Sequence, residues 1–191
     1  GTIAGGLGNR VGGGRAAIGG GFANTNSAQD GAIGGGSFNQ AGGTSATIAG
    51  GSRNTANGVM STISGGGANL ISTAAESATI AGGSNNTVQA AYATIHGGRQ
   101  NDIGTGSVHA AIGGGWNNEI QSNTLRATIG GGQENTIESL SYGSTIAGGY
   151  QQRIGQASLS SSIGGGYLNE IGDAASGATI AGGNTNRIDA N

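Results

Sequence analysis

The two histidines are the side chains of this sequence best suited to chemistry, because it contains no cysteine. His96 and His109 fall in adjacent copies of an internal repeat, and Asp102 is the carboxylate closest to both. A zinc site needs three or four protein ligands in most cases. The two histidines could form a weak metal site, but Asp102 is the sole third ligand near them. Ordinary surface substitutions are the favoured interpretation, so we expect no metal.

Carboxylates and arginines are interspersed rather than clustered, and we expect them to form a mixed, solvated face. Gly-Gly-x-Gly-x-Asp calcium repeats are absent, and glycine runs such as residues 65–67 lack the lysine of a phosphate-binding loop. The sequence therefore predicts a protein that is not an enzyme, with no catalytic residue and no cofactor. The charged residues concerned are Glu119, Glu134, Glu138, Glu170, Arg99, Arg126, Arg153 and Arg187.

Aromatic residues make up only 4% of the sequence, but four of them occupy the same place in their repeats. Each comes at the end of a glycine pair, four residues after an isoleucine that recurs in every copy. Aromatic residues often dominate the energetics of interfaces. The column is therefore a candidate contact for a sugar or a partner protein, and equally a candidate seal between subunits. The four residues are Phe22, Trp116, Tyr150 and Tyr167.

A repeat of 15 or 17 residues must position all of these side chains. The recurring isoleucine, its anchor, follows threonine in eight of twelve copies, and glycine comes two and three residues after it in every copy. Asparagine stands six residues after the anchor in eleven copies, with Gln152 as the exception, and isoleucine or valine stands eight after it in nine. The anchors are Ile3, Ile18, Ile33, Ile48, Ile63, Ile80, Ile95, Ile112, Ile129, Ile146, Ile163 and Ile180.

Each copy predicts two short strands joined by a glycine turn. A β-branched centre with alternating small neighbours is typical of a strand, whereas several glycines per copy exclude a helix. One such unit cannot bury its own apolar side, but stacked units form a continuous core. The sequence thus predicts an all-β fold, a parallel β-solenoid or β-roll of twelve coils, as one repeat domain over residues 1–191. At about 4.8 Å per coil the rod would be on the order of 57 Å long.

Alternation along each strand assigns inward and outward positions. The repeated asparagine shares the parity of the inward isoleucines, so its amide needs partners inside the rod. We expect a structural role, in which the amides hydrogen-bond along the rod or cap the glycine turn, rather than a row of ligands. The residues beside each anchor point outward and form a flat face of small side chains. That face predicts an oligomer, most simply a homotrimer, and the alternative is a monomer with an exposed face. Its representative residues are Thr47, Ala49, Thr79, Ala81, Thr145, Ala147, Thr179 and Ala181.

Charge and hydropathy limit the partners. A net charge of −2 from seven arginines and nine acids gives no basic field for nucleic acid or an anionic membrane. No apolar run is long enough to span a bilayer, so we expect no membrane contact by this segment. The sequence opens on "GTIAGG" and closes on "NRIDAN", both within a repeat. We therefore expect a segment of a longer fibrous protein.

The repeated AAIGGG of residues 16–21 and 110–115, and the ATIAGG of residues 46–51, 78–83 and 178–183, resemble the YadA-like head repeats of trimeric autotransporter adhesins. The resemblance covers the whole chain, and related repeats look like those of phage fibres and bacterial surface fibres. It implies a trimer of left-handed β-rolls held at the bacterial outer membrane. It also implies an extracellular or cell-surface adhesive rod whose partner is a host or cell-surface protein or glycan. The family's usual Asn-Ser-Val-Ala-Ile-Gly core is replaced here by threonine before isoleucine and a doubled or tripled glycine.

An ice-binding solenoid and a self-assembling extracellular filament are the alternative functions. Ice binding would use a threonine column with a spacing of about 4.8 Å. Alanine or serine interrupts that column at Ala17, Ala32, Ala111 and Ser162. An enzyme built on the solenoid would need a long loop, which the repeat does not provide. The threonines of the column are Thr2, Thr47, Thr62, Thr79, Thr94, Thr128, Thr145 and Thr179.

Overall fold

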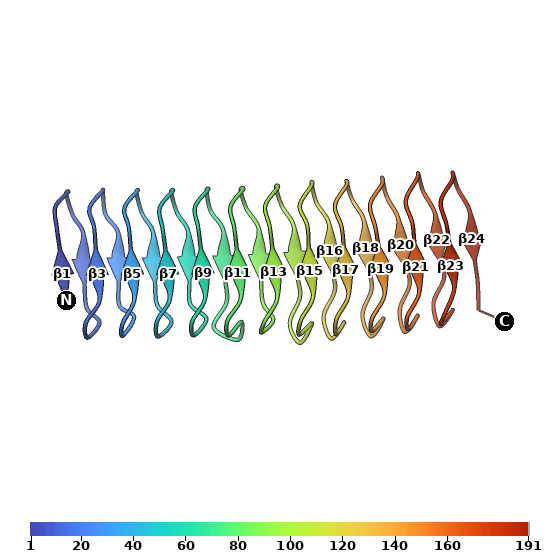
Figure 1. Cartoon of the computed structure of the whole chain (residues 1–191), viewed down its shortest axis with the longest axis horizontal. Helices are drawn as coiled ribbons and strands as arrows, with labels where there is room; N and C mark the ends of the chain where they lie inside the picture. The colour runs from blue at the N-terminus through green and yellow to red at the C-terminus, as the bar shows by residue number, and fades with distance from the viewer. Residues whose placement is uncertain (191) are drawn as a thin grey trace.

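The computed structural model describes residues 1–190 as a straight stack of coils built from strands alone (Figure 1). Each coil contributes one two-residue strand to each of two parallel sheets, and each sheet has twelve strands. The predicted parallel β-solenoid is therefore confirmed. None of the described residues forms a helix long and apolar enough to cross a membrane.

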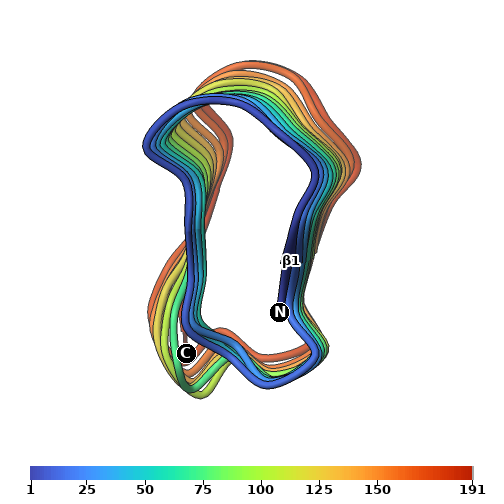
Figure 2. The same cartoon turned by 90° about the vertical axis from the view of Figure 1, so that its left-hand side faces the viewer.

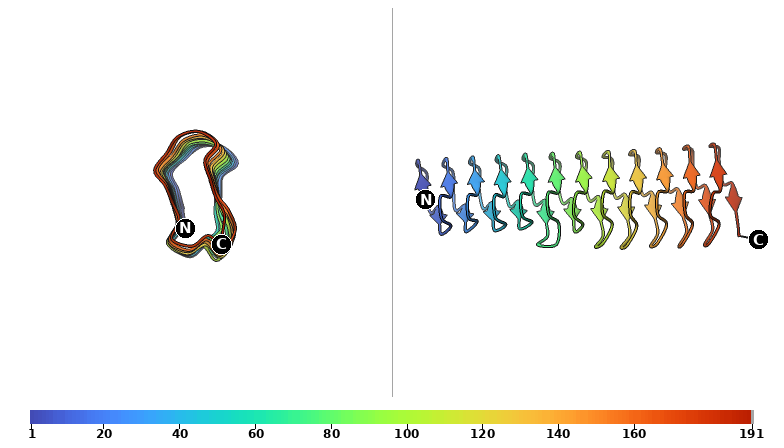
Figure 3. Two further views of the ribbon diagram at one scale, coloured as in Figure 1. Left: turned by 90° about the vertical axis from the view of Figure 1, so that its right-hand side faces the viewer. Right: turned by 60° about the horizontal axis from the view of Figure 1, so that its bottom comes forward.

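The two sheets form the long sides of an oblong coil (Figure 2), and both rows of strands run the length of the rod (Figure 3). The first sheet contains β1 Thr2–Ile3, β3 Ala17–Ile18, β5 Ala32–Ile33, β7 Thr47–Ile48, β9 Thr62–Ile63, β11 Thr79–Ile80, β13 Thr94–Ile95, β15 Ala111–Ile112, β17 Thr128–Ile129, β19 Thr145–Ile146, β21 Ser162–Ile163 and β23 Thr179–Ile180. The second contains β2 Arg10–Val11, β4 Thr25–Asn26, β6 Gln40–Ala41, β8 Thr55–Ala56, β10 Leu70–Ile71, β12 Thr87–Val88, β14 Asp102–Ile103, β16 Glu119–Ile120, β18 Thr136–Ile137, β20 Arg153–Ile154, β22 Glu170–Ile171 and β24 Arg187–Ile188.

Strand register places equivalent residues directly above one another. Thr128 pairs with Thr145 and Ile129 with Ile146, and the same relation holds along both sheets. The second strand of each coil has two residues and begins directly after the repeated asparagine, as β2 Arg10–Val11 follows Asn9. Each position of the repeat therefore packs against the equivalent position of the neighbouring coil.

A third hydrogen-bonded column runs along the rod and was not predicted. It consists of isolated parallel bridges between residues four positions after successive anchors, such as Trp116 with Gln133 and Tyr150 with Tyr167. The backbone N–H of Tyr150 donates to the carbonyl of Gly166 at 3.0 Å. Each coil is thus held to its neighbours on three sides.

The core is thin and continuous. The anchor isoleucines from Ile18 to Ile163 are at most 2% exposed, and the second-strand isoleucines face them from the opposite sheet. Small residues two positions before the anchors, such as Ala46, Ala78 and Ser144, are also buried. Fully burying one isoleucine contributes roughly 1.5 to 3 kcal/mol. The core therefore draws its stability from many identical small layers.

Three corner columns hold non-glycine residues in the left-handed region. One lies five residues after the anchors, as at Arg53 with φ 57°, and a second lies three before the next anchor, as at Arg15 with φ 54°. A third lies six before the next anchor in the later 17-residue coils, as at Leu140 with φ 65°. An L-residue in this region costs roughly 1–2 kcal/mol. Inter-coil hydrogen bonds offset that cost, since the N–H of Arg53 donates to the carbonyl of Ser37 at 2.9 Å.

Candidate functional surfaces

The repeated asparagine forms a buried ladder along the rod. The side-chain oxygen of Asn118 accepts the backbone N–H of Asn135 at 3.1 Å and its side-chain N–H at 3.0 Å. The same amide group of Asn135 donates to the carbonyls of Gly131 at 2.9 Å and Gly149 at 3.1 Å. One side chain thus joins three successive coils and caps the glycine turn. The expectation of a structural ladder rather than a ligand row is confirmed.

Gln152 interrupts this ladder through its extra methylene. Its backbone N–H still donates to the Asn135 side chain at 2.9 Å, and its side-chain oxygen still accepts the N–H of Asn169 at 3.0 Å. Its side-chain amide, however, donates to the carbonyl of Tyr150 in the same coil at 3.3 Å. Gln152 therefore keeps the stacking contacts and changes the turn cap.

The outward face of the first sheet, called here the flat face, carries the predicted small side chains. Thr47 and Thr145 are partly exposed, while Ala49 and Ala147 are exposed. No Asp, Glu or Arg occupies a position directly before or after any of the twelve anchors. The remaining representative residues, Thr79, Ala81, Thr179 and Ala181, also lie on this face, so the structure brings all eight together in two adjacent columns.

Of the two sheets, the second carries charged side chains, and near its C-terminal end these form an ion-pair network with carboxylates of the following turns. Arg153 contacts Glu138 at 2.6 Å, Glu170 at 2.5 Å and Asp173 at 3.0 Å. Arg187 continues the chain of contacts to Glu170 at 3.0 Å. The hydrogen bonds that Arg153 donates to the Glu138 carboxylate are the main cause that raises the pKa of Arg153. These half-exposed ion pairs connect several coils. The sequence analysis predicted a mixed, solvated face at these residues but not this link between coils.

Asp102 and Glu119 lie opposite each other on the second sheet without a matching arginine in the ion pairs of residues 1–190. One side-chain oxygen of Asp102 is buried and has no hydrogen-bond partner among those residues. Burial, followed by repulsion from Glu119, raises the pKa of the Asp102 carboxyl. The pair is therefore a local electrostatic defect in the sheet.

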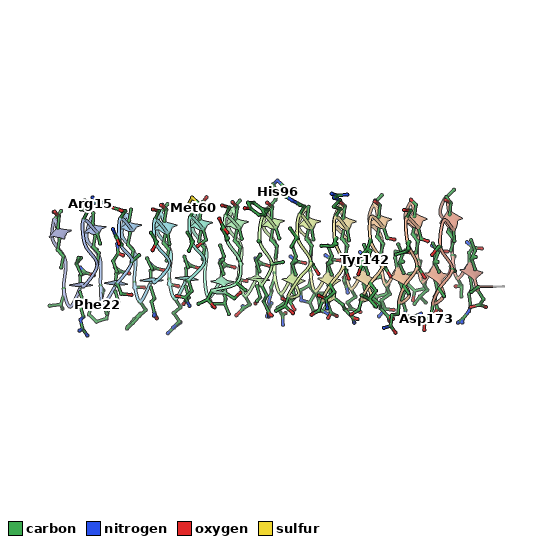
Figure 4. All side chains as sticks on the ribbon, turned by 90° about the horizontal axis from the view of Figure 1, so that it is seen from below. Arg15, Phe22, Met60, His96, Tyr142 and Asp173 are labelled. Atoms are coloured by element: carbon green, nitrogen blue, oxygen red, sulfur yellow. The ribbon has the colours of Figure 1, made fainter. Side chains whose placement is uncertain are left out.

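The histidines lie on different parts of the coil. His96 follows β13 and belongs to the flat face, on the opposite edge of the rod from Phe22 and Asp173 in Figure 4. His109 lies in the corner column and stacks on Tyr92, with ring centroids 5.1 Å apart. Over residues 1–190, no three His, Asp or Glu side chains gather as a metal site.

The aromatic column occupies the third ladder but is interrupted. Tyr150 and Tyr167 stack with centroids 5.2 Å apart, and Phe22 meets Phe38 edge-to-face. Trp116 donates its indole N–H to the side chain of Gln100 at 2.9 Å. Gln133 separates Trp116 from the tyrosine pair, and five further coils separate it from Phe22. The four predicted residues therefore share an edge without forming one continuous surface.

A groove that the sequence analysis missed lies in the corner column before the first sheet. It has a volume of about 510 Å³ and spans four successive coils. Its signal in the sequence is a run of apolar residues four positions before successive anchors, at Val108, Leu125, Tyr142 and Leu159. The residues that line it are Val108, His109, Leu125, Arg126, Tyr142, Gly143 and Ser160.

No protein-family model and no curated protein matches the chain. The function proposed below consequently depends on the repeat, the two unlike sheet faces and the chemistry of the exposed columns.

Proposed function

We propose that this chain is a non-enzymatic structural and adhesive rod of the cell exterior, an adhesin head or fibre segment that presents a repetitive surface for attachment. The observation that carries the proposal is the unbroken register of both sheets over twelve coils. Such a stack separates its two ends by a constant rise of about 4.8 Å per coil. It also places side chains that recur in successive coils at that spacing, and such a repeated surface suits multivalent attachment.

The flat face supports assembly of several copies, most simply a homotrimer. It is uncharged beside the anchors, whereas the second sheet carries the ion pairs of Arg153 and Arg187. The central part of a protein interface is typically depleted of charged residues. A thin core also gains most from burying a further surface. We therefore place the flat faces of the copies against one another and the charged sheets toward solvent.

Attachment is tested with beads that carry the full chain through one terminal tag. We expect such beads to adhere to cell surfaces more than beads carrying an unrelated protein of equal charge. Triple replacement of Trp116, Tyr150 and Tyr167 by serine tests the aromatic edge while leaving the core intact. Equal adhesion of chain-coated and control beads would contradict the proposal, and unchanged adhesion of the triple variant would exclude the aromatic edge alone.

Ice binding is the second candidate, and the flatness of the threonine column favours it. Eight of the twelve residues directly before the anchors are threonine, and the sheet holds them in register. Ala17, Ala32, Ala111 and Ser162 interrupt the column, which is why we rank this function below attachment. Thermal hysteresis of the purified chain, lost when Thr79 and Thr94 become lysine, would reverse the ranking. A self-assembling filament is the third candidate function, and it would form long fibres visible by electron microscopy.

A further inference from the structure

The corner groove is built on a rigid backbone. The N–H of Arg126 donates to the carbonyl of Val108 at 3.0 Å, and the N–H of Gly143 donates to that of Leu125 at 2.9 Å. The N–H of Ser160 donates to that of Tyr142 at 2.9 Å. These bonds hold the lining residues in a fixed left-handed column, so the groove is preformed.

Gly143 creates the opening of the groove. It stands in the corner column between Arg126 and Ser160, where every other coil except that of Gly177 carries a side chain. A Cβ added at Gly143 would meet only the Ser160 hydroxyl, 3.8 Å away. The missing side chain leaves space beside two exposed apolar residues, since Leu125 and Tyr142 are each 39% exposed. Figure 4 shows Tyr142 between the two sheet edges, on the side of the rod that faces the viewer.

Arg126 gives the groove its charge. No acidic residue lines the groove, and Arg126 forms no ion pair with any residue in 1–190. Arg15 occupies the same place in an earlier coil, but it pairs with Asp30. The guanidinium of Arg126 is therefore available to bind a carboxylate through two parallel hydrogen bonds.

We propose that this groove binds a carboxylated saccharide, with Arg126 on the carboxylate, Tyr142 against the C–H face of the sugar ring and Ser160 on a hydroxyl. Its volume of about 510 Å³ lies within the range of small-ligand sites. A peptide bound as an added strand would need free backbone donors. Here the N–H groups of Arg126, Gly143 and Ser160 are already used between coils. Side-chain recognition of a sugar acid fits the groove better, and the inference deepens the proposed attachment function on which it rests.

Isothermal titration calorimetry of the full chain tests the ligand class. The probes are 3′-sialyllactose and trigalacturonate as carboxylated saccharides, lactose as the uncharged control, and hexaglutamate as an acidic peptide. We expect at least one carboxylated saccharide to bind and lactose to bind much more weakly. Equal binding of lactose, binding of hexaglutamate alone, or no binding by either carboxylated probe would overturn the proposal.

Two variants locate the site. Arg126→Gln should weaken saccharide binding about tenfold or more, because it removes a charge-assisted contact. Arg15→Gln is the matched control, since Arg15 has φ 54° and Arg126 has φ 57° in the same column. Ser160→Tyr, at an exposed position, should block the groove while leaving the melting temperature unchanged. Unchanged affinity in both Arg126→Gln and Ser160→Tyr would overturn the assignment.

The bead assay separates this inference from the broader proposal. If Arg126→Gln beads adhere as well as unmodified ones, the rod still attaches and the groove is not the attachment site. If neither adheres while 3′-sialyllactose binds the groove, the groove assignment stands and the attachment function fails.

Discussion

At the scale of single residues, stability depends on one amide and one glycine per coil. The amide of Asn135 contacts Asn118, Gly131 and Gly149, so it serves three backbone or side-chain acceptors from inside the rod. A buried polar group that loses its partner costs roughly 1–3 kcal/mol. Even a conservative substitution in this column should therefore change the free energy of unfolding measurably.

Gln152→Asn should stabilise the rod. The shorter side chain would restore the turn cap that Gln152 replaces with its 3.3 Å contact to Tyr150. We expect the free energy of unfolding to rise by about 1 kcal/mol, the typical net value of one hydrogen bond. Urea unfolding followed by circular dichroism measures the change. Asn135→Gln is the mirror-image control and should lower stability, so two changes of the same sign would contradict the ladder argument.

Gly51→Ala should destabilise the rod, whereas Gly50→Ala should not. Gly51 has φ 89°, and a Cβ there would collide with the carbonyl oxygen of Gly66 in the next coil. We expect a loss of about 2 kcal/mol or more, because backbone cannot move aside. A Cβ at Gly50 meets no atom within 4 Å, so its effect should stay within about 0.5 kcal/mol. The melting temperatures of the two variants should differ clearly. Similar melting temperatures would show that the backbone of the turn can shift to accommodate the added methyl group.

At the scale of elements, the two sheets share an architecture but differ in electrostatics. The second sheet joins coils through Arg153, which contacts Glu138 and Glu170 on either side of its own strand. Exposed ion pairs contribute little singly, with a typical value below about 1 kcal/mol. The sheet tolerates this network on its outer side because the inner isoleucines supply the packing.

Asp102→Asn should stabilise the second sheet at neutral pH. The folded-state pKa of Asp102 is raised by burial and by Glu119, so the folded chain holds this proton up to a higher pH than the unfolded chain does. Stability then falls as pH rises through the window between the two pKa values, and the loss persists above it. Asparagine removes that loss, by about 0.2–1 kcal/mol for a like-charged pair lying directly opposite.

The pH profile of unfolding tests the assignment. The gain from Asp102→Asn should be full at neutral pH and should shrink as pH falls through the window between the raised pKa of folded Asp102 and its ordinary value. Glu138→Gln, which removes a paired carboxylate of the same sheet, is the control and should instead lower stability at pH 7. A gain for Asp102→Asn that stays constant down to pH 2 would mean that charge is not its cause.

At the scale of the whole molecule, assembly is the decisive property. We expect light scattering to show an oligomer, most simply a trimer, for the unmodified chain. Replacing Ala49, Ala81, Ala147 and Ala181 by arginine should yield a monomer, since charges in a close, poorly hydrated contact cost several kcal/mol, on the order of 3–5 when unpaired. If the variant stayed oligomeric, the flat face would have to be exposed to solvent rather than buried between copies.

A matched control for assembly comes from the opposite sheet. Thr25, Thr55, Thr87 and Thr136 occupy the equivalent outward positions there, and replacing them by arginine adds the same charge. That variant should remain oligomeric. Dissociation of both quadruple variants would indicate a general effect of charge rather than a buried flat face.

The length of the repeat and the inward positions of this fold could be predicted from the sequence. Identical residues that recur at a fixed interval all occupy the same environment only when the coils stack in register. The isoleucine anchors, the asparagine ladder and the eight flat-face residues follow from that rule, and the structure places them as predicted. The third ladder and the left-handed corners did not follow, because dihedral angles of non-glycine residues such as Arg53 leave no trace in composition.

Only the tertiary structure decided what the variable residues do. Arg15 and Arg126 occupy equivalent places in their coils, yet one pairs with Asp30 and the other borders the space left by Gly143. Likewise Arg153 joins three carboxylates, while Asp102 lies between Thr87 and Glu119 on the sheet and meets no arginine there. The physical reason is that a side chain in a solenoid contacts the coils above and below it. Its neighbours are therefore residues 15 or 17 positions away, and the stacking offset determines which of their atoms it meets.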